Sequence, residues 1–320
     1  MNEIKRARDF SEEKIFAMKQ ELNTVVPDRY KNDVTIVTCG SYARREASEA
    51  SDLDFYTIID DDMNLDVIRD EHEWTSLVPE ALSKHVAVPS ARGGAFDASV
   101  VRSSDILRQI GGNSETNDTL TRRMLLLLEG EGIFNNEKTA DLRKRILSKY
   151  ISDNMKDHQL SLFLLNDIIR YYRTICVDFE FKTSIFSRKP WGLRNIKLVF
   201  SRKLLYASGL FSVAMTVDRE SFRKIELLET LFSMPAIDRI QEICTPHRCE
   251  KMLKSYDSFL GRIKEKSVRD TLNEVTSENR SDSALFRELK NEGHHFTREL
   301  LKLYELTFDA THPIRKAVIF

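Results

Sequence analysis

The stretch that most constrains this chain is GSYARREASEASDLD, residues 40–54. It follows VTIVTC at 34–39, a β-branched run that predicts a buried strand. It leads into a second run of this kind, LDFYTII at 53–59. A Gly-Ser pair directly after a strand favours a tight turn that opens a helix. The sequence therefore predicts a strand–turn–helix–strand unit that ends in an Asp-x-Asp pair.

The chemistry of this unit follows from Asp52 and Asp54, which stand two positions apart. Strand side chains alternate between faces, so both carboxylates are expected to point the same way and to repel each other. A divalent cation relieves that repulsion, and Mg²⁺ prefers carboxylate and phosphate oxygens. Gly40 lets a ligand approach the backbone, and the helix-start amides at Ser41 suit a phosphate. The unit thus fits phosphoryl or nucleotidyl transfer. The alternatives are a solvated strand start for the aspartates and a simple N-cap for Ser41.

The order and spacing of these residues resemble a known family. A strand, Gly-Ser, about ten residues and then Asp-x-Asp on the next strand is similar to the signature of the DNA polymerase β-like nucleotidyltransferase superfamily. Ala43-Arg44-Arg45-Glu46 and Ser51-Asp52-Leu53-Asp54 look most like its bacterial branch. That branch includes glutamine-synthetase adenylyltransferases, PII uridylyltransferases, aminoglycoside nucleotidyltransferases and small antitoxin nucleotidyltransferases. The close resemblance covers about 20 residues.

The resemblance implies two Mg²⁺ ions held by Asp52, Asp54 and a third carboxylate from a later strand. That third acid helps to hold the catalytic metal or accepts the proton of the incoming hydroxyl. Asp97, in the strand-like run AFDASVV, is the candidate, and its alternative is a turn aspartate at a strand entrance. Asp105 reads instead as a carboxylate in the first turn of a helix. The resemblance further implies that Gly40 and Ser41 contact the nucleotide phosphates.

Basic residues supply the remaining candidates for nucleotide binding. No acidic residue occurs between Glu180 and Asp218, while several lysines and arginines do. Within this span Arg194 and Lys197 are three positions apart on a predicted helix after Pro190, a spacing that places both on one face. That face suits a triphosphate or an RNA backbone, or it is simply solvated. Arg44, and Arg123 of the pair at 122–123, complete the set, each with a surface or structural role as the alternative.

The whole chain predicts an α+β fold of two domains. Strands and helices mix up to about residue 135, and an all-helical array follows, so we expect a nucleotidyltransferase domain at 1–135 and a helical substrate-binding domain at 136–320. The boundary is expected in GEGIFNNEK, residues 130–138. Apolar residues make up 41% and the net charge is −1, which is ordinary for a soluble protein. Four scattered cysteines favour a reducing compartment, and the sequence predicts a cytoplasmic protein that does not insert into membranes.

The sequence favours an enzyme that uses ATP or another NTP as donor and moves an NMP to a hydroxyl. The acceptor stays open between protein, small molecule and RNA, as does the oligomeric state. The alternative is a nucleotide-binding module of antitoxin or defence type with a degenerate third acid. An RNA-processing transferase that uses the basic span as its track is a further possibility.

Overall fold

The computed structural model describes residues 1–63, 74–87, 100–108, 110–113, 115–183 and 190–319. These residues form two compact units. The first, called the sheet unit below, comprises residues 6–152, and the second, called the helical unit, comprises residues 153–320 with residues 1–5. The expected third carboxylate, Asp97, lies outside the described residues.

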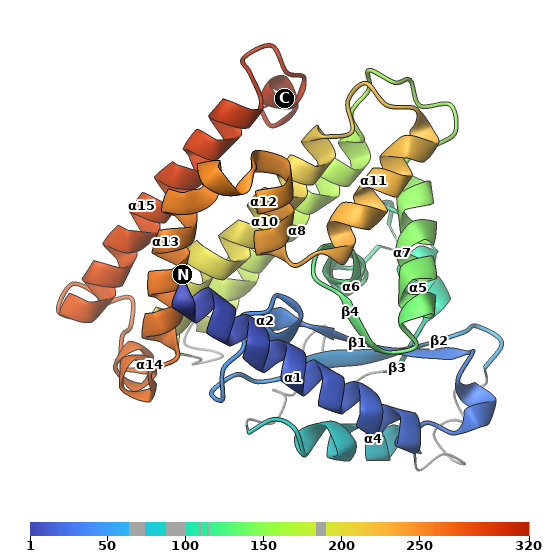
Figure 1. The fold of residues 1–320 in the computed structure, drawn as a ribbon, viewed down its shortest axis with the longest axis horizontal. Coiled ribbons are helices and arrows are strands. Elements are labelled where there is room, and N and C mark those ends of the chain that lie inside the picture. Colours follow the sequence, from blue (N-terminus) through green and yellow to red (C-terminus); the bar gives the residue numbers. More distant parts are fainter. Residues whose placement is uncertain (64–73, 88–99, 109, 114, 184–189, 320) are drawn as a thin grey trace. The chain divides into compact units, whose positions relative to one another are not determined.

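A four-stranded mixed sheet organises the sheet unit, in the order β3-β2-β1-β4 (Figure 1). Its central strand β1 (Val34–Cys39) is antiparallel to β2 (Asp54–Ile59) on one side and to β4 (Glu131–Phe134) on the other. The outer strand β3 (Val100–Arg102) runs parallel to β2. All six residues of β1 are buried, as expected for a β-branched strand flanked on both sides. The predicted small mixed sheet is confirmed.

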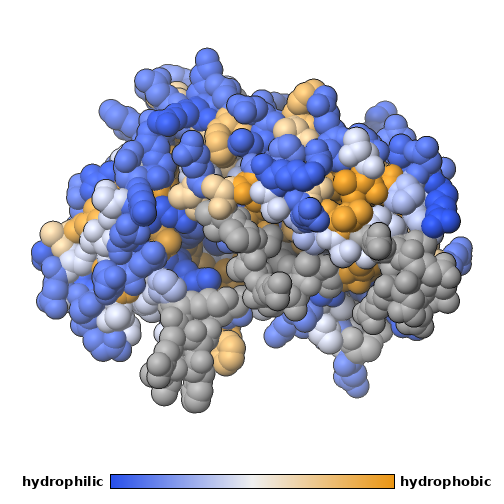
Figure 2. Space-filling model, turned by 90° about the horizontal axis from the view of Figure 1, so that it is seen from below, coloured by the Kyte–Doolittle hydropathy of each residue, from blue (hydrophilic) through white to orange (hydrophobic). Residues whose placement is uncertain are grey.

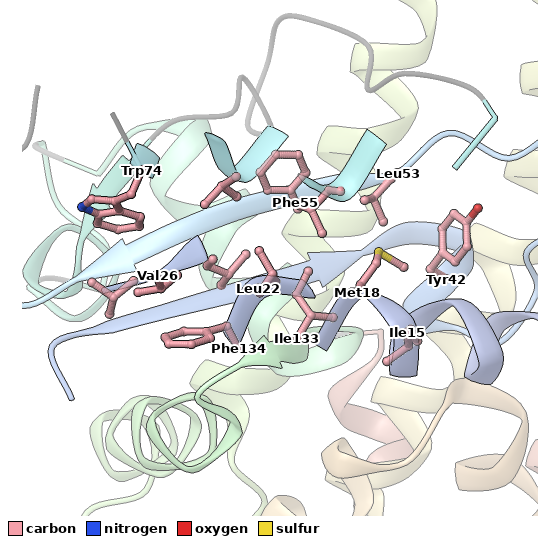
Figure 3. Close-up of a cluster of buried hydrophobic side chains, with 14 of the residues drawn as sticks. Ile15, Met18, Leu22, Val26, Tyr42, Leu53, Phe55, Trp74, Ile133 and Phe134 are labelled. Atoms are coloured by element: carbon pink, nitrogen blue, oxygen red, sulfur yellow. The ribbon is translucent and has the colours of Figure 1, made fainter. Parts of the chain in front are cut away.

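Helices cover both faces of this sheet (Figure 1). On one face α1 (Asn2–Val25) and α4 (Trp74–Ser83) bury a continuous apolar cluster (Figure 3). On the other face α6 (Asn117–Leu128) and α7 (Asn136–Tyr150) pack against β1, and α7 also packs against β4. The short elements of the unit are η1 (Asp28–Tyr30), α2 (Gly40–Ala43) and α5 (Ser103–Leu107).

Strand β4 is the element that the sequence did not predict. It lies inside the segment expected to link the domains, and it has only four residues, one of them a glycine. Gly132 matters because a Cβ there would come within 2.6 Å of Thr139 Oγ1, so the missing side chain lets α7 fold back onto the sheet. Helix α7 packs on β1 and β4, and the first compact unit extends to residue 152. The expected domain bounds 1–135 and 136–320 stay a prediction.

The helical unit contains no strand among its described residues, as the sequence predicts. Aromatic rings fill part of its core. Phe200 stacks on Phe259 with ring centroids 4.4 Å apart, and it packs in a tilted arrangement against Phe296 at 5.1 Å. The unit and the sheet unit together make an α+β protein. Its elements are α8 (Leu162–Thr183), α9 (Trp191–Lys197), η2 (Leu198–Arg202), α10 (Lys203–Ala214), α11 (Ser221–Ser233), α12 (Ala236–Cys244), α13 (Pro246–Ile263), α14 (Lys266–Asn273), α15 (Ala284–Thr307) and α16 (Ile314–Ala317).

The surface is mixed in character. Figure 2 shows one face of the molecule, on which hydrophilic residues predominate and hydrophobic ones form separate patches. In the part of the chain that the structure describes, no helix combines the length and the apolar character that a membrane span requires.

Candidate active site

The Gly40 turn brings the Gly-Ser pair against the second aspartate. Gly40 directly follows β1 and has a φ of +75°, a backbone conformation that favours glycine. A Cβ at this position would lie 2.9 Å from Asp54 Oδ2. In the ladder, Cys39 is paired with Asp54 across the two strands, which explains the proximity. Both the conformation and the close approach therefore require glycine at position 40.

Helix α2 is short, which affects how it can bind an anion. It has four residues, and Ser41 at its second position is half-buried. A helix of this length has little macrodipole. Any phosphate seated at the turn would therefore depend on the local backbone N–H groups and the Ser41 hydroxyl.

The predicted alternation of side chains before and within β2 is present. Leu53 and Phe55 are 1% and 5% exposed and point into the apolar cluster beneath α1 and α4 (Figure 3). Asp52 and Asp54 are half-exposed between them, at positions that face away from that cluster. Asp52 lies within electrostatic range of Tyr42 in α2. Burial, and secondly the Asp52 charge, raise the pKa of Tyr42 to about 12. The two carboxylates thus share one side of the chain and border the Gly40 turn.

Arg44 and Glu46 form a buried ionic cluster rather than a solvated surface. Arg44 Nε donates to Glu46 Oε2 at 3.0 Å, and its Nη1 donates to a carboxylate oxygen of Glu129, the last residue before Gly130 and β4. All three side chains are less than a tenth exposed. Arg44 therefore ties the turn after α2 to the end of α6. Its expected contact with nucleotide stays a prediction, and its contacts in the fold favour a positioning role.

The rest of the loop between α2 and the aspartates is held by α1 and β4. Arg45, with a φ of +62°, lies 3.4 Å from Glu131 and 3.7 Å from Glu12. Burial opposes ionisation of Glu131, but Arg45 and Lys19 outweigh it and hold the pKa of Glu131 below its usual value. Farther along, Ala47 N donates to the buried Ser11 hydroxyl at 3.1 Å. The loop that delivers Asp52 and Asp54 is therefore fixed by the fold.

The arginine pair at 122–123 divides into a buried and a half-exposed member. Arg123 is 1% exposed, and its Nε donates to Tyr150 Oη at 2.8 Å while its Nη2 pairs with Glu115. These contacts favour a structural role, and the predicted nucleotide contact of Arg123 stays a prediction. Arg122 is half-exposed and within electrostatic range of the Tyr56 hydroxyl, two residues after Asp54 on the same strand face. The sequence pattern pointed to this pair, but the predicted nucleotide-binding member was Arg123 and not Arg122.

Part of the chain matches a known protein family. Residues 19–89 match the family model of the nucleotidyltransferase domain. The match contains β1, the Gly40 turn and both aspartates, and it is consistent with the predicted polymerase β-like superfamily. No curated protein matches the chain, so its place in the bacterial branch stays a prediction. A nucleotidyltransferase domain supports transfer of a nucleoside monophosphate in general.

The segment that matches the nucleotidyltransferase family model contains donors that fit a divalent cation. Asp52 and Asp54 present hard carboxylate oxygens, half-exposed and on one side of the strand. The described residues contain no group of three or more His, Cys, Asp or Glu side chains that could hold a metal ion. Asp97, the expected third ligand, lies outside those residues, so its role stays a prediction.

The other basic candidates lie beyond the segment that matches the family model. Arg194 and Lys197 are half-exposed on α9 of the helical unit. Their spacing of three places them on one helical face, as predicted. Their contact with a nucleotide stays a prediction.

Proposed function

We propose that this protein is a metal-dependent nucleotidyltransferase that transfers an NMP from an NTP to a hydroxyl acceptor and releases pyrophosphate. The observation that carries the proposal is the apposition of Gly40 to the Asp54 carboxylate, with Asp52 on the same side of the chain. This apposition lies inside the segment that matches the nucleotidyltransferase domain.

Each part of the site has a role in that reaction. The Gly40 turn lies close enough to Asp54 to seat the donor's phosphates beside it, and the Ser41 hydroxyl is a further donor there. Asp52 and Asp54 would hold Mg²⁺, together with Asp97 as the proposed third ligand. The chemistry that Mg²⁺ would supply there, when bound, is neutralisation of the negative charge on the phosphates. The acceptor hydroxyl attacks the α-phosphorus as the bond to pyrophosphate breaks, and Asp97 is the proposed base for its proton.

The ionic cluster around Arg44 contributes preorganisation. Arg44 is held by Glu46 and Glu129, so carboxylates within the fold balance its charge. The loop geometry is therefore set before the substrate arrives, and fixed groups avoid a reorganisation cost during the reaction. Arg44 is a positioning residue in this scheme.

Label transfer tests the proposal. Purified protein is incubated with Mg²⁺, cell extract and each NTP labelled at the α-phosphate, and label is followed into protein, RNA and small solutes. We expect label in one of these fractions, with release of one pyrophosphate for each label transferred. Asp54→Asn should abolish transfer, whereas Asp62→Asn, an exposed aspartate beyond the far end of β2, should retain it.

Two results would count against the proposal. Transfer by Asp54→Asn at the wild-type rate would remove Asp54 from the reaction. Tight NTP binding by the wild-type protein without pyrophosphate release, with every fraction supplied, would favour a nucleotide-binding module of antitoxin or defence type.

A further inference from the structure

A close helix contact in the helical unit assembles polar groups that the transfer reaction does not use. Between α9 and α10 the chain widens into the π-helical turn η2, a feature often found at functional sites. Helix α15 packs directly on this turn at Gly293, where an added Cβ would clash with the side chain of Val199. The absence of a side chain at Gly293 therefore lets the two helices meet closely.

Two lysines flank this contact and bridge it. Lys290 Nζ donates to Asn195 Oδ1 at 2.6 Å, and Lys203 Nζ donates to Thr297 Oγ1 at 2.9 Å. Residues 290, 293 and 297 lie on one face of α15, at the i, i+3, i+7 spacing. The two ammonium groups thus lie along the same helix contact, one on each side of Gly293.

The charges of these lysines are not balanced by carboxylates. Among the residues that the structure describes, neither ammonium has a carboxylate oxygen within 4.0 Å, and both side chains are half-buried. Burial lowers the pKa of Lys203, and burial together with the charges of Lys203 and Arg280 lowers the pKa of Lys290. The group that favours a charged Lys203 is the Cys176 thiol, whose own pKa is raised by burial. Within the described part of the chain, the two ammonium groups thus have no carboxylate to balance their charge.

Lys224 shows how this unit uses a lysine for structure alone. Its side chain is fully buried, and Nζ donates to three backbone carbonyls, those of Asp157, Gln159 and Thr216. An ammonium carries three N–H donors, so Lys224 is saturated. Lys203 and Lys290 each have one hydrogen-bond acceptor among the described residues, which leaves two donors on each for a ligand.

We propose that Lys203 and Lys290 form a binding site for a phosphate-bearing anion in the helical unit. Two lysines act as point charges for phosphate oxygens, and the half-buried setting strengthens the attraction because the local dielectric is lower. The site goes beyond the proposed function, since it requires neither Asp52 nor Asp54. Inorganic phosphate, pyrophosphate and the phosphates of a nucleotide share the required chemistry.

Calorimetry in the presence of EDTA tests the site apart from any metal-dependent binding. Wild-type protein is titrated with phosphate, pyrophosphate and each NTP at constant ionic strength. We expect binding of at least one probe, and Lys203→Gln or Lys290→Gln should weaken it about tenfold or more, which is the scale of one charge-assisted hydrogen bond. Lys302→Gln is the matched control, because Lys302 lies on the same helix and is paired with Glu299 at 2.7 Å. It should bind as the wild type does.

The order of affinities identifies the source of the ligand. An NTP that binds more tightly than pyrophosphate indicates contacts to the base or sugar, whereas equal affinities indicate recognition of phosphate alone. Absence of binding by every probe, or binding unchanged in the Lys203→Gln, Lys290→Gln double variant, would overturn the proposal.

Thermal stability gives a second readout that a purely structural role would not produce. Replacing one of two repelling cations should leave the melting temperature of the ligand-free protein unchanged or raise it. The probe that binds should raise the melting temperature of the wild type and of Lys302→Gln, but not that of Lys290→Gln. Lys290 would serve only the fold if Lys290→Gln had a lower melting temperature without ligand and the probe raised that temperature as much as it does in the wild type. If Lys203→Gln does not fold, Lys290→Gln and the charge-retaining Lys203→Arg carry the test.

Discussion

Four buried or half-buried cations of the sheet unit and the helical unit, with a fifth that is saturated, differ in the groups that hold them. In the sheet unit, Arg44 is tied to Glu46 and Glu129, and Arg123 is tied to Glu115. In the helical unit, Lys224 is saturated by carbonyl groups, while Lys203 and Lys290 each donate to one neutral oxygen. The difference separates cations that hold the chain in place from cations that remain available to a ligand.

The comparison also explains the charged residues between the Gly-Ser turn and Asp-x-Asp. Arg44, Arg45 and Glu46 make ion pairs that fix a loop between two strands. Asp52 and Asp54, which follow this loop, are half-exposed. The stretch thus contains both ion pairs that support the loop and the two aspartates proposed to hold the metal.

The largest expected effect comes from breaking the Arg44 cluster. Arg44→Met would leave Glu46 and Glu129 buried without their cation, which costs about 3–5 kcal/mol of unfolding free energy. Denaturant unfolding measures the loss. Arg145→Met is the control, because Arg145 makes an exposed pair with Asp141 in the same unit, and its loss should stay under about 1 kcal/mol. Equal losses in the two variants would contradict a supporting role for the cluster.

Gly40→Ala, compared with Gly111→Ala, separates the backbone strain of an added Cβ from its close approach to Asp54. The added Cβ meets Asp54 Oδ2 at 2.9 Å, so the carboxylate must move, and a displacement of about 1 Å lowers transfer about 10²-fold. Gly111→Ala is matched, because Gly111 has a φ of +77° and nothing within 4 Å of its added Cβ. Both variants should lose about 1–2 kcal/mol of stability, but only Gly40→Ala should lose activity in the label-transfer assay. Full activity in Gly40→Ala would place the reacting groups elsewhere.

Lys224→Met sharpens the comparison within the helical unit. The variant leaves three buried carbonyl groups without their donor, and we expect a loss of about 1–3 kcal/mol in denaturant unfolding. Lys203→Met removes a cation with one neutral partner, so its stability should be unchanged or higher. A larger loss for Lys203→Met than for Lys224→Met would reverse the distinction between structural and available lysines.

Acidification should produce the smallest effect. The folded-state pKa of Glu131 is lowered, so its pairs contribute stability above the unfolded value of 4.5, and this contribution is lost as the pH falls through the folded value. Unfolding free energies measured between pH 7 and pH 3 should therefore decline below about pH 4.5. Glu131→Gln should flatten that decline. An identical pH profile in the variant would show that Glu131 does not contribute to it.

Local patterns were sufficient to predict the centre of the sheet unit. The β-branched run of β1, the glycine turn and the alternation of Leu53 and Phe55 with the aspartates each depend on residues close in sequence. The partners of the basic residues could not be predicted in this way. Arg44 meets Glu129 85 positions away, and Asn195 meets Lys290 95 positions away. Strand β4 was missed because its four residues show no alternation and owe their place to pairing with β1.

The central claim is that Asp52 and Asp54 together bind a divalent cation beside the Gly40 turn. Titration with Mn²⁺ in the presence of a non-hydrolysable NTP, followed by electron paramagnetic resonance, measures this most directly. The account predicts a bound Mn²⁺ in the wild type and in Asp62→Asn, and its weakening by about tenfold or more in both Asp52→Asn and Asp54→Asn. Mn²⁺ affinity that is the same in all four proteins would contradict it.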